Sequence, residues 1–151
     1  MAVRSAVVNK KLVTAGMISI VEAGTDKPCG DHRSPEDGIL ADGYTYVHSI
    51  DAGSYDGPAL WSPESDATLV YQVTSVGVDR SQVEWLADRV RLTLVSRAAL
   101  GGFQWPFPEL AGMKVIHREP DGLSPGVIYE GPPENRVYSV PERYRISVVS
   151  I

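Results

Sequence analysis

The stretch that decides the fold is residues 67–91, which read ATLVYQVTSVGVDRSQVEWLADRVR. Its first ten residues are rich in Thr, Val and Tyr, and apolar side chains fall on both alternating faces. This pattern predicts a central β-strand that is covered on at least one side. Gly77 ends the strand, and Asp79 then occupies the N-cap position of a helix, with Gln82 three residues later as in a capping box.

The helix that follows Asp79 is predicted to be amphipathic and about four turns long. Five apolar residues recur at helical spacing and form the stripe that packs on the sheet: Val83, Leu86, Ala87, Val90 and Leu94. Trp85 and Leu92 form a second stripe beside the first, seven residues apart. These two residues either widen the buried face or contact another subunit, because buried aromatic anchors carry much of the energy of interfaces.

The N-terminal part of the chain predicts a helix over residues 2–13, with its valines inward. Residues 17–21 form a short buried piece, and their β-branched side chains leave helix and strand both open. Turn-forming residues dominate residues 24–43 and 51–66, so both segments are predicted to be loops. The second loop carries a short apolar pair at Leu60 and Trp61 that is compatible with a small strand.

Four further strands are predicted, over residues 44–50, 114–119, 126–129 and 136–151. The third is expected to return along the second after a turn at Asp121 and Gly122. The last strand alternates, with five large residues on one face: Tyr138, Val140, Tyr144, Ile146 and Val148. Pro141 has no amide hydrogen to donate, so it marks an edge or a bulge of this strand.

Together these elements predict a single α+β domain over residues 1–151, with a mixed or antiparallel sheet and two main helices packed against it. A chain of 151 residues with 43% hydrophobic and 22% charged residues has the composition of a soluble globular protein. No apolar run approaches the ~18 residues that cross a bilayer, so no membrane association is expected. The single cysteine, Cys29, excludes an internal disulfide and indicates a reducing site of synthesis.

The loop GGFQWPFPELAG, residues 101–112, carries three large aromatic side chains, Phe103, Trp105 and Phe107. Leaving such side chains in water is unfavourable by roughly 1.5–3 kcal/mol each. The loop is therefore expected either to fold back onto its own domain or to dock onto a neighbour.

Charge is distributed unevenly along the chain, whose net charge is −5. Residues 34–79 contain eight acids and no Lys or Arg, whereas the chain from Arg80 onward contains nine basic and eight acidic residues. A net acidic chain argues against a dedicated nucleic-acid binder. The acidic stretch is either a solvated surface or one side of a subunit that associates with other copies in a fixed orientation.

The sequence lacks the motifs of common catalytic and nucleotide-binding sites, including the phosphate-binding loop, Gly-x-Ser-x-Gly and His-Glu-x-x-His. Cys29, Asp31 and His32 lie together, but one cysteine and one histidine fall short of a four-ligand zinc set. We therefore expect no enzymatic activity, no cofactor and no metal. A small enzyme or ligand-binding domain stays an alternative, with a pocket lined by His48, Tyr46 and Tyr71.

Residues 70–77, VYQVTSVG, and residues 79–91, DRSQVEWLADRVR, resemble the tail terminator proteins of long-tailed bacteriophages, above all those that infect actinobacteria. In that family a strand of the form vyQVTsVG leads into a helix of the form eQaewlaDrVR. The final stretch VPERYRI, residues 140–146, resembles the family's closing strand. The likeness extends more loosely to residues 44–49 and to the N-terminal helix, whereas the loops at 24–43 and 101–112 match nothing in the family.

The resemblance implies a small subunit that closes into a ring, usually a hexamer, at the head-proximal end of the tail tube. Such a ring ends tube polymerisation and joins the tail to the head-side connector or stopper protein, and DNA passes through its pore without being read. The implied partners are other copies of the chain, the major tail tube protein and the connector. The implied location is the virion, at the junction of tail and neck, after assembly in the cytoplasm of the host bacterium.

The resemblance and the apolar pattern together select candidate contacts with subunits or partners: Trp85, Leu92, Phe103, Trp105, Phe107 and Tyr144. Strand addition at an exposed sheet edge is the expected means of docking, with the C-terminal strand and the long loops as the expected elements. An acidic pore would keep DNA from adhering, and the candidate lumen or interface acids are Asp51, Asp56, Glu64 and Asp66. The nearest alternative function is another virion neck protein, such as a head-completion or stopper subunit.

Overall fold

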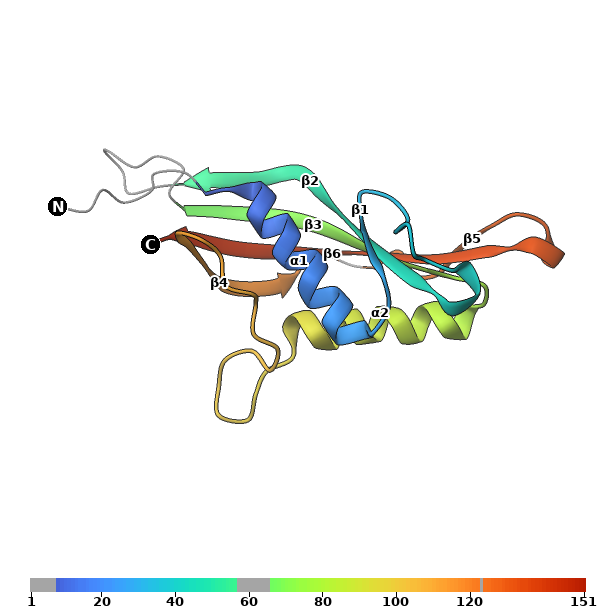
Figure 1. Cartoon of the computed structure of the whole chain (residues 1–151). Helices are drawn as coiled ribbons and strands as arrows, with labels where there is room; N and C mark the ends of the chain where they lie inside the picture. Colours follow the sequence, from blue (N-terminus) through green and yellow to red (C-terminus); the bar gives the residue numbers. More distant parts are fainter. Residues whose placement is uncertain (1–7, 57–65, 123) are drawn as a thin grey trace.

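The structure is a computed structural model that describes residues 8–56, 66–122 and 124–151. It has the predicted α+β architecture, in which a six-stranded mixed sheet carries helices α1 (Lys10–Thr25) and α2 (Arg80–Val95) on one face (Figure 1). The strands are β1 (Cys29–Asp31), β2 (Tyr44–Asp56), β3 (Asp66–Gly77), β4 (Met113–Pro120), β5 (Ile128–Glu130) and β6 (Val137–Ser150). Two short 3-10 helices, η1 (Leu40–Asp42) and η2 (Pro133–Asn135), lie in the connections.

The strand order is β1-β2-β3-β6-β4, and β5 pairs with the beginning of β6. The β1–β2 pair is parallel and the other pairs are antiparallel. Strand β6 pairs with β3 from Tyr138 to Val149 on one side and with β4 and β5 on the other. The C-terminal strand therefore lies inside the sheet, and the expectation that it offers a free edge for docking is wrong. Among the described strands, free edges remain on β1, β4 and β5 and on the part of β2 that β1 does not cover.

Pro141 lies between the stretch of β6 that pairs with β5 and the stretch that pairs with β4. Among the described residues it pairs only with Thr74 of β3. A missing amide donor is tolerated at such a local edge, which confirms the interpretation of this proline.

The main hydrophobic core lies between the sheet and the two helices. Leu69, Tyr71 and Val73 alternate along β3 and face the helices, as the strand pattern predicts. They pack with residues of both helices and of β6: Val13, Met17, Val21, Val90, Leu94, Tyr144 and Ile146. The hydroxyl groups of Tyr71 and Thr14 lie 2.9 Å apart and form a hydrogen bond, so the tyrosine is buried without leaving its polar atom unpaired. All five residues of the first α2 stripe are buried, as predicted.

Helix α1 begins later and runs further than the sequence suggested. The Asn9 side chain caps it by accepting a hydrogen bond from the Leu12 amide, and the helix continues through residues 17–21 to Thr25. The prediction of a helix over 2–13 was therefore misplaced, and residues 1–7 lie outside the described residues. Gly16 of α1 is a site of close packing, because a Cβ there would lie 2.5 Å from Cε1 of Phe107.

Both predicted loops in the first half contain regular structure. Strand β1 lies within residues 24–43 and pairs in register with β2, and residues 51–56 continue β2 beyond a register shift. A three-residue strand depends on the strand with which it pairs more than on the β-propensity of its own residues. Sequence analysis therefore did not predict β1. The proposed strand at Leu60 and Trp61 lies outside the described residues. Strand β5 pairs with β6 and not with β4, so the predicted return of residues 126–129 along 114–119 is wrong.

Candidate interaction surfaces

The junction between β3 and α2 is fixed by the residues that the sequence pattern singled out. Asp79 Oδ1 accepts a hydrogen bond of 2.8 Å from the Gln82 amide, and Gln82 Oε1 accepts one of 2.8 Å from the Val78 amide. The Gln82 side-chain nitrogen also donates to the Ala41 carbonyl oxygen at 2.8 Å. A Cβ at Gly77 would overlap Gln82 Oε1, so a larger residue there would displace the Gln82 side chain. The segment therefore orients α2 on the sheet and ties it to η1.

The second stripe of α2 is at the surface. Trp85 is 52% exposed and Leu92 is 51% exposed, whereas the neighbouring Leu86 is only 1% exposed. The sequence left two interpretations of this stripe, a wider buried face of the helix or a contact with another subunit. The first is wrong for the single chain, because both side chains are about half exposed. Large aromatic and aliphatic side chains at the surface can serve as anchors of an interface with a partner. Their role as subunit contacts stays a prediction.

The aromatic loop folds back onto its own domain. Trp105, Phe107 and Leu110 are partly buried and pack against the main core, with Phe107 seated on Gly16 of α1. The Trp105 carbonyl oxygen accepts a hydrogen bond of 2.6 Å from Nη2 of Arg118 in β4. The protomer thus covers much of the aromatic surface itself, and a second role of the loop in contacts between molecules stays a prediction.

Phe103 is held between two arginines. The Cζ atoms of Arg97 and Arg118 lie 4.2 Å and 4.1 Å from the centroid of its ring, a geometry in which each cation is attracted to the ring face. Arg118 is only 3% exposed, and its Nη1 has no hydrogen-bond partner among the described residues. Burial, with a smaller contribution from the charge of Arg97, lowers the pKa of Arg118 to about 10. Sequence analysis missed this residue because its place in a predicted strand gave no sign of burial.

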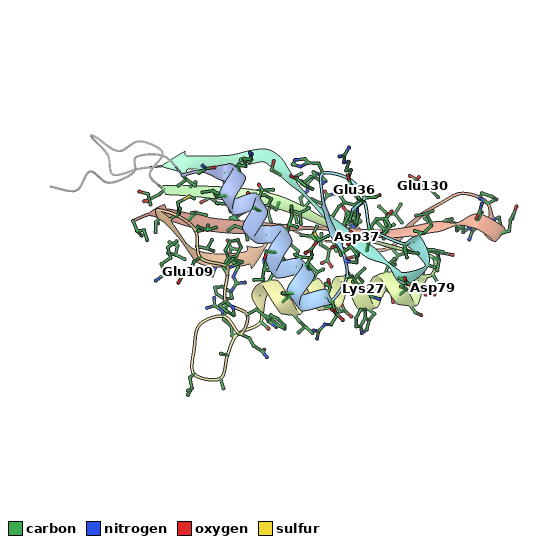
Figure 2. All side chains as sticks on the ribbon, viewed as in Figure 1. Lys27, Glu36, Asp37, Asp79, Glu109 and Glu130 are labelled. Atoms are coloured by element: carbon green, nitrogen blue, oxygen red, sulfur yellow. The ribbon has the colours of Figure 1, made fainter. Side chains whose placement is uncertain are left out.

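A groove of about 560 Å³ lies beside this arginine, between the aromatic loop, β4 and the last residue of the chain. About half of the exposed lining surface is polar, although eight of the eleven lining residues are apolar: Phe103, Pro106, Phe107, Pro108, Leu110, Met113, Val115 and Ile151. Three charged residues also line it: Arg118, Lys114 and Glu109, the last of which is labelled in Figure 2. The groove is suited to a ligand or chain segment that combines apolar groups with negative charge.

The hairpin of residues 97–103, which includes the start of the aromatic loop, projects from the body of the protein (Figure 1). Its arms meet at the bridge between Arg97 and Phe103, and the Ala98 amide donates a hydrogen bond of 3.0 Å to the Gly102 carbonyl oxygen. Leu100 at the tip is fully exposed. Sequence analysis did not single out this leucine, because one apolar residue between small residues carries no periodic signal.

The remaining candidate residues differ in how far they are buried and in whether the structure describes them. Tyr144 is buried in the main core, so the isolated protomer does not present it to a partner. Asp66 is half-buried, and its Oδ1 is buried without a hydrogen-bond partner among the described residues. The side chains of Asp51 and Asp56 and the whole of Glu64 lie outside the described residues.

The pocket suggested for a ligand-binding domain does not form from its three proposed residues. Tyr46 and His48 alternate with the buried Thr45 and Val47 along β2, so they lie on the face of the sheet opposite the helices. Tyr71 lies on the helix-covered face. The physical reason is the two-residue period of a strand, which places Tyr71 and the residue paired with His48, Gln72, on opposite faces.

The structure also shows the surroundings of Cys29, Asp31 and His32, which lie close together in the sequence. The Cys29 thiol is buried, and burial raises its pKa to about 12. His32 hydrogen-bonds to the Asp31 carboxylate at the surface. Within the described ranges, no group of three or more histidine, cysteine or acidic side chains is arranged to bind a metal ion.

No protein-family model matches this chain, and no curated protein shows significant similarity to it. Neither described helix is both long and apolar enough to cross a membrane. The interaction surfaces therefore have to be interpreted from their own chemistry.

Proposed function

We propose that this protein is a tail terminator subunit that assembles into a ring, usually a hexamer, at the head-proximal end of a phage tail tube. The observation that carries the proposal is the exposure of large apolar side chains on separate parts of the described protomer, with Trp85 and Leu92 on α2 and Leu100 at the hairpin tip. Contacts with other subunits or with the tube would bury them. The assignment of the protein to a phage tail rests on the resemblance of residues 70–91 and 140–146 to the terminator family.

A closed ring needs two different and complementary surfaces on each subunit. The protomer offers such a difference, because residues 34–79 carry eight acids without a Lys or Arg, and the mixed half of the chain follows. Docking on the tube end by strand addition would use the free edge of β4, where Ile116 is exposed. No step of this function requires a nucleophile or a cofactor.

An acidic pore remains part of the proposal, with Asp51, Asp56, Glu64 and Asp66 as its candidate residues. Carboxylates facing the pore would repel DNA phosphates and keep the passage free. Replacing the four acids by the corresponding amides is expected to leave ring formation intact and to slow DNA passage at infection. A map of the ring with all four acids on its outer surface would exclude this part of the proposal.

The direct test is incubation of the protein with purified tail tubes of a matching phage, followed by negative-stain electron microscopy. We expect extra density at one end of each tube and no further growth when tube subunits are added. A head-completion or stopper protein would leave bare tube ends growing, and that result would overturn the proposal.

A further inference from the structure

The groove beside Phe103 is lined by two basic residues, Lys114 and Arg118, and by one acidic residue, Glu109, and Arg97 lies close by against the Phe103 ring. Arg97, Lys114 and Arg118 have no carboxylate partner among the described residues. Burying a guanidinium group is unfavourable unless its donors are paired, and Nη1 of Arg118 is unpaired. This region is therefore suited to an anionic partner.

The shape and lining of the groove restrict that partner further. Its volume of about 560 Å³ is in the range of ligand pockets, roughly 300–1,000 Å³. About half of the exposed lining is apolar surface of aromatic, proline and aliphatic residues, so an apolar group on the occupant would contribute to binding beside its charged groups. A chain segment with an apolar side chain between carboxylates satisfies both conditions.

The chain itself contains such a segment in the loop before β2, residues 36–42, which read EDGILAD. Ile39 is 60% exposed, although it is a large apolar residue. Glu36, Asp37 and Asp42 surround it in sequence, and no basic side chain pairs with them among the described residues. We call residues 36–42 the acidic knob.

The acidic knob is held in place before any partner arrives. The Asp42 amide donates a hydrogen bond of 3.0 Å to the Ile39 carbonyl oxygen, which closes the turn. The Gln82 side chain anchors the adjacent Ala41 carbonyl to the start of α2. A segment that is already ordered loses little conformational entropy on binding.

We propose that the groove of one protomer receives the acidic knob of a second copy of this chain, with Ile39 against the apolar walls and carboxylates near Arg118 and Lys114. Figure 2 shows Glu36 and Asp37 well away from Glu109, which marks the groove. Knob and groove are thus different surfaces, so each copy can donate one and accept the other, as ring closure requires. This assignment rests on the proposed ring-forming function and names one of its interfaces.

Charge reversal of full-length protein tests the assignment, with Asp37→Lys in the knob and Lys114→Glu beside the groove. Each variant alone brings like charges together, and we expect the concentration for half-assembly to rise at least about tenfold. An equimolar mixture of the two is expected to regain assembly. In the mixture, the lysine introduced at position 37 meets the glutamate introduced at position 114 at one interface, and the unaltered Asp37 and Lys114 meet at the next. Light scattering after size-exclusion chromatography measures the mass of each sample.

Glu130→Lys in β5 is the matched control, since it makes the same change of charge at an exposed site that belongs to neither the knob nor the groove. It is expected to assemble like the wild type. Circular dichroism melting verifies that each variant is folded, and the recovery in the mixture excludes a folding defect as the cause.

The outcomes separate this inference from the proposed function. If the wild type assembles and either single reversal assembles equally well, or if the mixture stays dissociated, the knob and groove do not meet and only this inference fails. If the wild type remains a monomer with and without tail tubes, the ring-forming function fails, and this inference fails with it.

Discussion

Trp85 and Leu86 are adjacent on α2 but are expected to contribute to different equilibria. A tryptophan side chain can bury up to ~250 Å², and Trp85 is 52% exposed, so about half of that area is left for a partner. At ~25 cal/mol per Å² this area corresponds to about 3 kcal/mol for each subunit contact. Loss of this contribution raises the dissociation constant by roughly a hundredfold.

Trp85→Lys is the variant of choice, because the lysine stem still covers apolar surface beside the helix while its ammonium group would have to be buried in an interface. We expect assembly to weaken about a hundredfold or more, and the free energy of unfolding of the protomer to fall by about 1 kcal/mol. Leu86→Ala is the contrasting variant, and it is expected to lower the free energy of unfolding by about 2–5 kcal/mol because Leu86 is buried.

Light scattering over a concentration series reports on assembly, and urea unfolding of dilute protein reports on the protomer. A role of Trp85 in a subunit interface is refuted if Trp85→Lys assembles at the same concentration as the wild type. It is equally refuted if Trp85→Lys loses as much protomer stability as Leu86→Ala, since Trp85 would then belong to the core.

Three further predictions concern the protomer. Gly24→Ala should lower the free energy of unfolding by about 1–3 kcal/mol, because a Cβ at Gly24 of α1 would overlap Oγ1 of Thr93 in α2. Urea unfolding measures this change. An unchanged midpoint would disprove the close approach of the two helices. Burial, with smaller contributions from His32 and Arg143, lowers the pKa of His48 below 6.5. The unfolded chain therefore binds the proton more readily than the folded chain, and the free energy of unfolding rises with pH just below 6.5. His48→Gln should flatten that rise, and an identical pH profile would contradict the assignment. The Cys29 thiol, with its pKa raised to about 12, should react with iodoacetamide at about pH 8 only after unfolding, and fast labelling of native protein would exclude its burial.

Sequence patterns predicted the helices and strands in which the spacing of apolar residues repeats over many residues. The strand–cap–helix segment was placed correctly because β-propensity, the Asp79 cap and the α2 stripe all indicate the same structure. The alternation of the last strand likewise placed Tyr144 and Ile146 on the buried face of β6. The candidate contacts Trp85 and Leu92 were found for the same reason, since they recur seven residues apart beside the buried stripe of the helix.

Features that depend on contacts distant in sequence were not predictable. The close packing at Gly16 depends on Phe107, which lies far along the chain. The interior place of β6 follows from pairing on both of its sides, which alternation alone does not reveal. The burial of Arg118 depends on Phe103 and on the folded aromatic loop, so the groove and its charge emerge only in three dimensions.

The most direct test of the central claim is the mass of the wild-type protein in solution and on tail tubes, measured by light scattering and by electron microscopy of tube ends. We expect a closed assembly of several copies of the 16.4 kDa chain, about six by the family resemblance, that caps one end of each tube. A particle of 16.4 kDa at every concentration, together with bare tube ends, would contradict it.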